Sequence, residues 1–87
     1  MRKIVVLNHA EIAELDRQDP DTEKDGGFQG FLVKLQRKLR RGTQELILDE
    51  KDLEKISRYA FDSGKGTWEK RLVHIFSREL GPKLGRD

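Results

Sequence analysis

Basic side chains gathered in two segments have the clearest potential for chemistry in this sequence. They lie in residues 28–41 and 67–80, and the candidates are Lys34, Arg37, Arg40, Arg41, Lys70, Arg71, His74 and Arg78. At helical spacing these residues lie opposite the apolar residues of their segment, with Arg40 at the flank. Such a face attracts phosphate groups or an acidic protein surface. We therefore predict that these eight residues bind a protein partner or nucleic acid.

The sequence offers no comparable set for catalysis or for a metal ion. It has no cysteine, its serines lie in no nucleophile-elbow motif, and its glycine-rich segments lack the phosphate-binding pattern of a Walker loop. The acidic segment that starts at Asp21 opens like a calcium loop, but its twelfth position is Leu32 instead of a bidentate glutamate. We predict no enzyme activity, no cofactor, no metal and no small-molecule substrate.

An internal repeat predicts the elements that position the basic residues. LNHAEIAELDR (7–17) aligns with LDEKDLEKISR (48–58), and KDGGFQGFLVKLQRKLR (24–40) aligns with GKGTWEKRLVHIFSREL (64–80). Charge follows the same order, because acidic, basic, acidic and basic segments succeed one another along the chain. The acidic segments are therefore also candidate partners for the basic faces, within the fold or across a dimer.

Local signals within the repeat define the first helix of each copy. Asn8 and Asp49 are good N-caps, and an acidic residue stands three positions after each, as in a capping box. We predict helices at about 9–17 and 50–61. The aliphatic runs KIVVL (3–7) and QELIL (44–48) precede the caps and favour strands.

The second helix of each copy is predicted from an apolar stripe. In residues 28–41 the stripe contains Phe28, Phe31, Leu32, Leu35 and Leu39, and in residues 67–80 it contains Trp68, Leu72, Ile75, Phe76 and Leu80. Gly42 and Gly81 follow these segments, where a left-handed residue commonly ends a helix.

These elements predict an α+β fold built from two strand–helix–helix repeats, residues 1–42 and 43–87, in a single domain. A unit of about 40 residues buries too little apolar surface to fold alone. We therefore expect the two copies to cover each other with pseudo-twofold symmetry around a two-stranded ribbon.

The segment RYAFDSGKGTWEKRLVHIFSREL (58–80), with GGFQGFLVKLQ (26–36) ahead of it, resembles a group of short, uncharacterised bacterial proteins from plasmid and phage-like contexts. This sequence departs from their pattern at Gly66-Thr67-Trp68, where a paired glycine is expected. The resemblance implies mobile-element biology, no known activity and no role for any single residue.

Two functions follow from these features as expectations. The first is a non-enzymatic, cytoplasmic accessory protein or inhibitor that binds a protein partner or a second copy of itself. Tyr59, Phe61 and Trp68 are then candidate interface anchors, although core packing explains each of them as well. The alternative is a nucleic-acid-binding protein that uses the basic faces of helices 28–41 and 67–80. We expect no membrane association, because the run IVVL is too short to span a bilayer.

Overall fold

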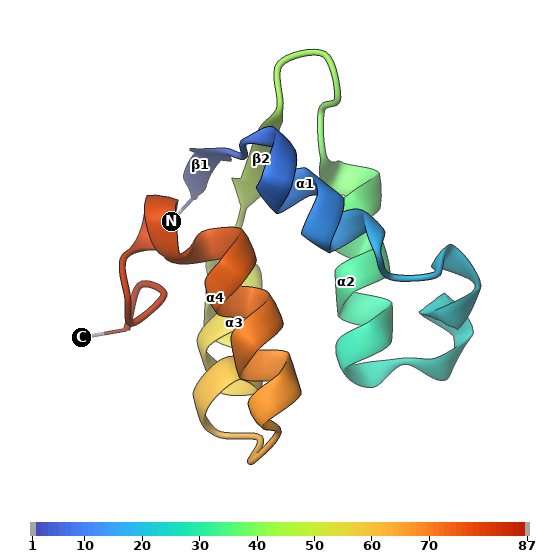
Figure 1. Cartoon of the computed structure of the whole chain (residues 1–87), viewed down its shortest axis with the longest axis vertical. Helices are drawn as coiled ribbons and strands as arrows, with labels where there is room; N and C mark the ends of the chain where they lie inside the picture. The colour runs from blue at the N-terminus through green and yellow to red at the C-terminus, as the bar shows by residue number, and fades with distance from the viewer. Residues whose placement is uncertain (1, 87) are drawn as a thin grey trace.

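Two short strands and the helices beside them form the molecule, and the computed structural model describes residues 2–86 (Figure 1). In chain order the elements are β1 (Lys3–Val6), α1 (His9–Asp16), the 3₁₀ helix η1 (Pro20–Asp25), α2 (Gly27–Lys38), β2 (Glu45–Leu48), α3 (Glu50–Phe61) and α4 (Gly66–Leu80). The predicted α+β class and two-stranded ribbon are therefore confirmed. Within the described residues, no helix is long and apolar enough to cross a membrane.

The ribbon is antiparallel, and its four pairs run from Lys3–Leu48 to Val6–Glu45, with Val5 opposite Leu46. Each strand is one residue shorter than predicted, although the backbone N–H of Leu7 still donates to the carbonyl of Gln44 at 3.0 Å. Alternation along the strands sends Val5, Leu46 and Leu48 into the core, because successive side chains of a strand point to opposite faces. The helices therefore cover one face of the ribbon only.

Capping boxes begin both of the helices that follow a strand. The side chain of Asn8 accepts the N–H of Glu11, and the Glu11 carboxylate accepts the N–H of Asn8, both at 2.8 Å. Asp49 and Asp52 repeat this reciprocal pair at the start of α3. Both boxes were predicted, and the observed helices agree with the predicted ranges to within one residue.

The predicted apolar stripes form the core. All five stripe residues of α2 are buried, as are Leu72, Ile75 and Phe76 of α4. Trp68 and Leu80 pack against this core from half-buried positions. Helix α4 packs against both α1 and α3, whereas α2 packs mainly against η1.

The end of α2 corrects one prediction. The helix ends at Lys38 and not at 41, and Gly42 does not cap it. Leu39 turns into extended backbone so that the N–H of Arg40 can donate to the carbonyl of Glu45 at 2.9 Å. The left-handed residue of this connection is Gln44, with φ of 63°. Gly81, by contrast, ends α4 as predicted, with φ of 89°.

Two segments gained structure that the sequence did not suggest. The acidic link folds as η1, whose first turn is capped by the side chain of Asp19 through the N–H of Asp21 at 2.9 Å. The turn after α4 returns Leu84 to the core, where it is buried. Both segments add cover to a core that would otherwise be thin in a chain of 87 residues.

Gln44 provides a test of the connection into β2. A left-handed backbone costs an ordinary residue about 1 kcal/mol and costs glycine almost nothing. We predict that Gln44→Gly is more stable to unfolding than Gln44→Ala by about 1 kcal/mol, the reverse of their order at an ordinary position. Urea denaturation followed by circular dichroism measures the difference, and equal stabilities would contradict the left-handed assignment.

Candidate interaction surface

The basic residues of the α2 segment face acidic residues of the same chain. Three of the four form ion pairs: Lys34 with Asp52 at 3.3 Å, Arg37 with Glu23 at 2.7 Å, and Arg41 with Asp16 at 2.6 Å. The Arg41 pair is bidentate, and its hydrogen bond with Asp16 raises the pKa of the guanidinium. Arg40 is exposed and has no ion pair among residues 2–86.

The basic residues of α4 lie along α1. Arg71 donates to the carboxylate of Glu14 at 3.3 Å and to the side-chain oxygen of Gln18 at 2.7 Å. Its side chain is only 18% exposed and lies over the ring of Phe28. His74 lies 3.9 Å from Glu14.

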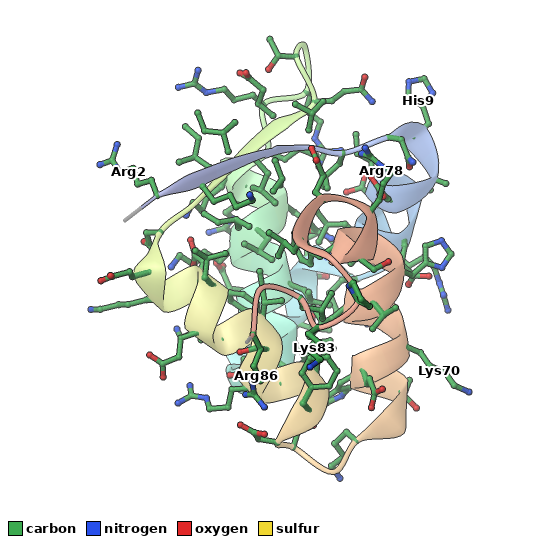
Figure 2. The ribbon with its side chains drawn as sticks, turned by 90° about the vertical axis from the view of Figure 1, so that its left-hand side faces the viewer. Arg2, His9, Lys70, Arg78, Lys83 and Arg86 are labelled. Atoms are coloured by element: carbon green, nitrogen blue, oxygen red, sulfur yellow. The ribbon has the colours of Figure 1, made fainter. Side chains whose placement is uncertain are left out.

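Arg78 and Lys70 complete the α4 set and differ from each other. Arg78 donates to both carboxylate oxygens of Glu11, at 3.1 and 2.9 Å, and to the backbone carbonyl of Val6 (Figure 2). Lys70 projects away from the protein body in the same figure and has no ion pair among the described residues. Within the α4 set, Lys70 is therefore the residue whose charge is not paired with a carboxylate of the described residues.

These contacts show that the two basic faces have acidic neighbours within the chain, while the assignment of the eight residues to partner binding stays a prediction. Six of the eight predicted residues, all except Arg40 and Lys70, lie beside carboxylates of the chain itself. The physical reason is the packing of acidic α1 against α4 and of acidic η1 against α2. The acidic segments, which were predicted as candidate partners of the basic faces within the fold, are the segments that these basic residues contact.

Three of the carboxylates in these contacts are buried, namely Glu11, Glu14 and Asp52, and two of them also cap a helix. Glu11 of α1 and Asp52 of α3 are the acidic members of the two capping boxes, and their exposed fractions are 4% and 0%. Each receives a base from a helix in the other half of the chain: Arg78 of α4 reaches Glu11, and Lys38 of α2 reaches Asp52. Removal of either carboxylate would therefore affect both a helix start and a contact between helices.

The pKa values of these two carboxyls follow from their partners. Burial acts to raise the pKa of Asp52, but hydrogen bonds from Lys38, from the N–H of Asp49 and from Lys34 outweigh it, so the pKa lies below its ordinary value of 3.8. Burial also acts to raise the pKa of Glu11, but hydrogen bonds from Arg78 and from the N–H of Asn8 outweigh this effect. The pKa of Glu11 is therefore lowered. Both groups are therefore carboxylates at neutral pH.

The outer face of the ribbon is the apolar surface left without cover. Ile4 is 59% exposed and Val6 is 45% exposed, and these are the exposed large hydrophobic residues of the described chain. Ile47 lies directly opposite Ile4 in the register and is half-buried. We call Ile4, Val6 and Ile47 the ribbon face.

On the free edge of β1, the backbone groups of Val6 are already hydrogen-bonded to side chains of α4. The N–H of Val6 donates to the carboxylate of Glu79 at 2.6 Å, and its carbonyl accepts from Arg78. Side chains of α4 thus occupy the backbone groups that an added strand would need here. A partner could therefore pack on the outer face of the ribbon more readily than it could add a strand at this edge.

The aromatic residues near the α3–α4 turn pack against one another. The rings of Trp68 and Phe28 are stacked with centroids 4.6 Å apart, and Tyr59 meets both rings edge-on, at 5.7 and 5.6 Å. Phe61 is half-buried, with the Arg86 guanidinium 5.5 Å from its ring. Core packing therefore accounts for these residues, which were also candidate anchors of an interface.

The described residues line shallow hollows on the surface of the molecule. One, of about 520 Å³, is an open depression between α1 and the connection into β2, and its charged pair is Asp16 with Arg41. Another, of about 410 Å³, lies between α3 and the turn that carries Leu84. Among residues 2–86, no cluster of three histidine or carboxylate side chains is arranged to hold a metal ion.

The ribbon face was missed in the sequence because it lies inside an unbroken aliphatic run. In IVVL, Ile4 and Val6 point outward while Val5 and Leu7 point inward. An unbroken apolar run is typical of a strand that is covered on both faces of its sheet. The signal that distinguishes the faces lies in the partner strand, where Glu45 pairs with Val6.

Comparison of the chain with protein-family models, with curated proteins and with solved structures finds no match. The function is therefore argued from the surfaces described above.

Asp52 provides a test of the buried ion pairs. Asp52→Asn removes the negative charge that faces Lys34 and Lys38, and we expect a loss of about 2 kcal/mol in the free energy of unfolding near neutral pH. This figure allows for solvent screening of the half-exposed Lys34.

The dependence on pH has a defined sign. Because folding lowers the pKa of Asp52, its stabilisation is present above the ordinary pKa of 3.8 and is lost as pH falls through the lower folded-state value. The gap between wild type and variant should therefore narrow below about pH 4. Thermal melts from neutral pH to about pH 2 measure it, and Asp25→Asn, at an exposed site on η1, is the control. A gap that does not change with pH would exclude this role for Asp52.

Proposed function

We propose that this protein is a small, non-enzymatic binding protein that docks on another protein surface through its ribbon face. The observation that carries the proposal is the exposure of Ile4 and Val6 on a flat strand surface, with Ile47 beside them. Single exposed apolar residues are common, but neighbouring branched residues on one sheet face form a patch that association would bury. Each square ångström of apolar surface removed from water contributes about 25 cal/mol.

The form of the patch also supports protein docking. A strand face is held by backbone hydrogen bonds, and its branched side chains have few rotamers to lose on binding. Charged groups border it, including Arg2 at the start of β1 and Glu45 on β2. An apolar centre with a polar rim is the usual composition of a protein interface. A protein of this kind fits an accessory or inhibitory role in the cytoplasm.

The alternative function, nucleic-acid binding, receives less support. A phosphate backbone would compete with the carboxylates that already lie beside six of the eight candidate bases. Arg40 and Lys70 have free charges, but Arg40 lies near the ribbon and Lys70 lies in the first turns of α4, toward the opposite end of the molecule (Figure 1). Two separated charges make a weak track for a phosphate backbone.

We also infer that the two halves arose by duplication and are related by a pseudo-twofold axis near Val5 and Leu46. With the Leu7–Gln44 hydrogen bond included, the ladder is centred on this pair, and an offset of 41 residues exchanges its two strands. With an offset of 41 for the first helices and 40 for the second, the buried ion pair Glu11–Arg78 corresponds to Asp52–Lys38. An experimental structure in which residues 2–39 do not superpose on residues 43–80 would contradict the duplication.

A photo-cross-linking amino acid at position 4 tests the docking surface. With p-benzoylphenylalanine in place of Ile4, irradiation in the native host should attach a protein to this chain. The same group at Lys24, which is exposed on η1, should give no adduct. Mass determination after denaturing electrophoresis identifies the attached species. Equal adducts at both positions, or none at position 4, would reject the ribbon face as the docking surface.

The nucleic-acid alternative is tested with Arg40→Glu/Lys70→Glu. Among the eight candidates these two positions have no ion pair with a described residue, whereas changes at Arg37, Arg41 or Arg71 would also break ion pairs. We expect the wild type and the double variant to show equally little retention on duplex DNA or single-stranded RNA at low salt. Salt-sensitive retention of the wild type that the double variant loses would favour the alternative.

A further inference from the structure

We infer that the occupant of the ribbon face is a second copy of this chain, packed face to face with the first in antiparallel orientation. This inference rests on the proposed function, because it names the partner of the same surface. It is argued from the way in which charge and apolar surface are distributed along the ribbon.

The outer face of the ribbon has a charge of opposite sign at each end. Positions 2, 4 and 6 share this face, and Figure 2 shows Arg2 projecting away from the helices at the start of β1. At the other end Glu45 lies opposite Val6, and the apolar pair Ile4 and Ile47 lies between the two charges. Among the side chains of the two strands the order along the face is therefore basic, apolar and acidic, and the exposed Arg40 lies beside Glu45, with which it forms a backbone bridge.

Arg2 and Glu45 cannot meet within one copy. Continuing the register places residue 2 level with residue 49, four residues along β2 from Glu45. At about 3.4 Å per residue this is a separation of about 14 Å. No ion pair of Arg2 with a described residue occurs in the monomer, and among residues 2–86 the side-chain carboxylate of Glu45 accepts only the hydroxyl of Thr43, at 3.1 Å.

A second copy turned about a twofold axis perpendicular to the strands brings these charges together. Arg2 of each copy then lies beside Glu45 of the other copy. Ile4 and Ile47 of one copy pack against Ile4 and Ile47 of the other. A twofold interface needs this kind of self-complementary patch. The copies stack about 10 Å apart, as two sheets do. Closure of the β1 edge by Glu79 and Arg78 disfavours a continuous sheet through that edge.

The size of the ribbon limits the affinity. Two strands of four residues provide much less than the roughly 1,200 Å² of total buried area that stable complexes use. We therefore expect a dimer that exchanges quickly and has a dissociation constant of about 10 μM or weaker.

Sedimentation equilibrium of the purified chain, from about 10 μM to about 1 mM, measures this self-association. Ile4→Thr keeps a branched strand residue but removes apolar surface, and it should weaken the dimer at least fivefold. Arg2→Glu and Glu45→Arg should each weaken it by a similar factor. The charge exchange Arg2→Glu/Glu45→Arg should restore it to within about twofold of wild type, because the pair is re-formed across the axis.

Lys70→Glu makes the same charge change as Arg2→Glu at a site away from the ribbon and should leave the dissociation constant unchanged (Figure 2). Circular dichroism melts confirm that each variant is folded. A wild type that stays monomeric throughout this range overturns the inference, as does a charge exchange that fails to restore the dimer. If the wild type is monomeric while position 4 still cross-links to a different protein, the docking function stands and only the second copy is rejected.

Discussion

The fold depends on two buried carboxylates, each of which acts twice. Glu11 and Asp52 complete the capping boxes of α1 and α3, and each also accepts from a base on a helix of the other half of the chain. The backbone N–H groups at a helix start need an acceptor, and a buried carboxylate needs a cation. One side chain meets both needs, so the start of each helix and its contact with the opposite half form together.

The same constraint decides what the charged residues can do. Acidic and basic residues make up 39% of the chain, and from the sequence alone we predicted that the basic residues bind partners. In the structure Arg71 and Arg78 bind the acidic side of α1, and Arg41 binds its last residue, Asp16. A small domain with little apolar surface to bury uses these pairs to orient its helices. Much of its positive charge therefore takes part in the fold, and the outer face of the ribbon is left as exposed apolar surface.

The parts predictable from sequence were those governed by local rules. The capping boxes at Asn8 and Asp49 and the stripe of α2 follow from spacing along a few turns, and the structure has all of them. The end of α2 was not predictable, because Arg40 leaves the helix to pair with Glu45 across the turn. The engagement of the basic residues depends equally on which helix lies beside them, and helical spacing gives the face of a residue without giving its neighbour. Whether the repeated pattern reflects pseudo-twofold symmetry stays a prediction.

The exposed ribbon face follows from the number of elements available to cover the sheet. Two strands have two faces and two edges, and the helices of this chain cover the inner face and, through Glu79 and Arg78, part of the β1 edge. A polar residue at position 4 or 6 would make the outer face soluble at little cost to strand formation, since threonine also favours strands. Branched aliphatic residues at both positions cost solubility unless something covers them. Nothing within residues 2–86 does so. On the proposed function the cover is another molecule, and the opposite charges of Arg2 and Glu45 at the two ends of the face favour an antiparallel copy of the same surface.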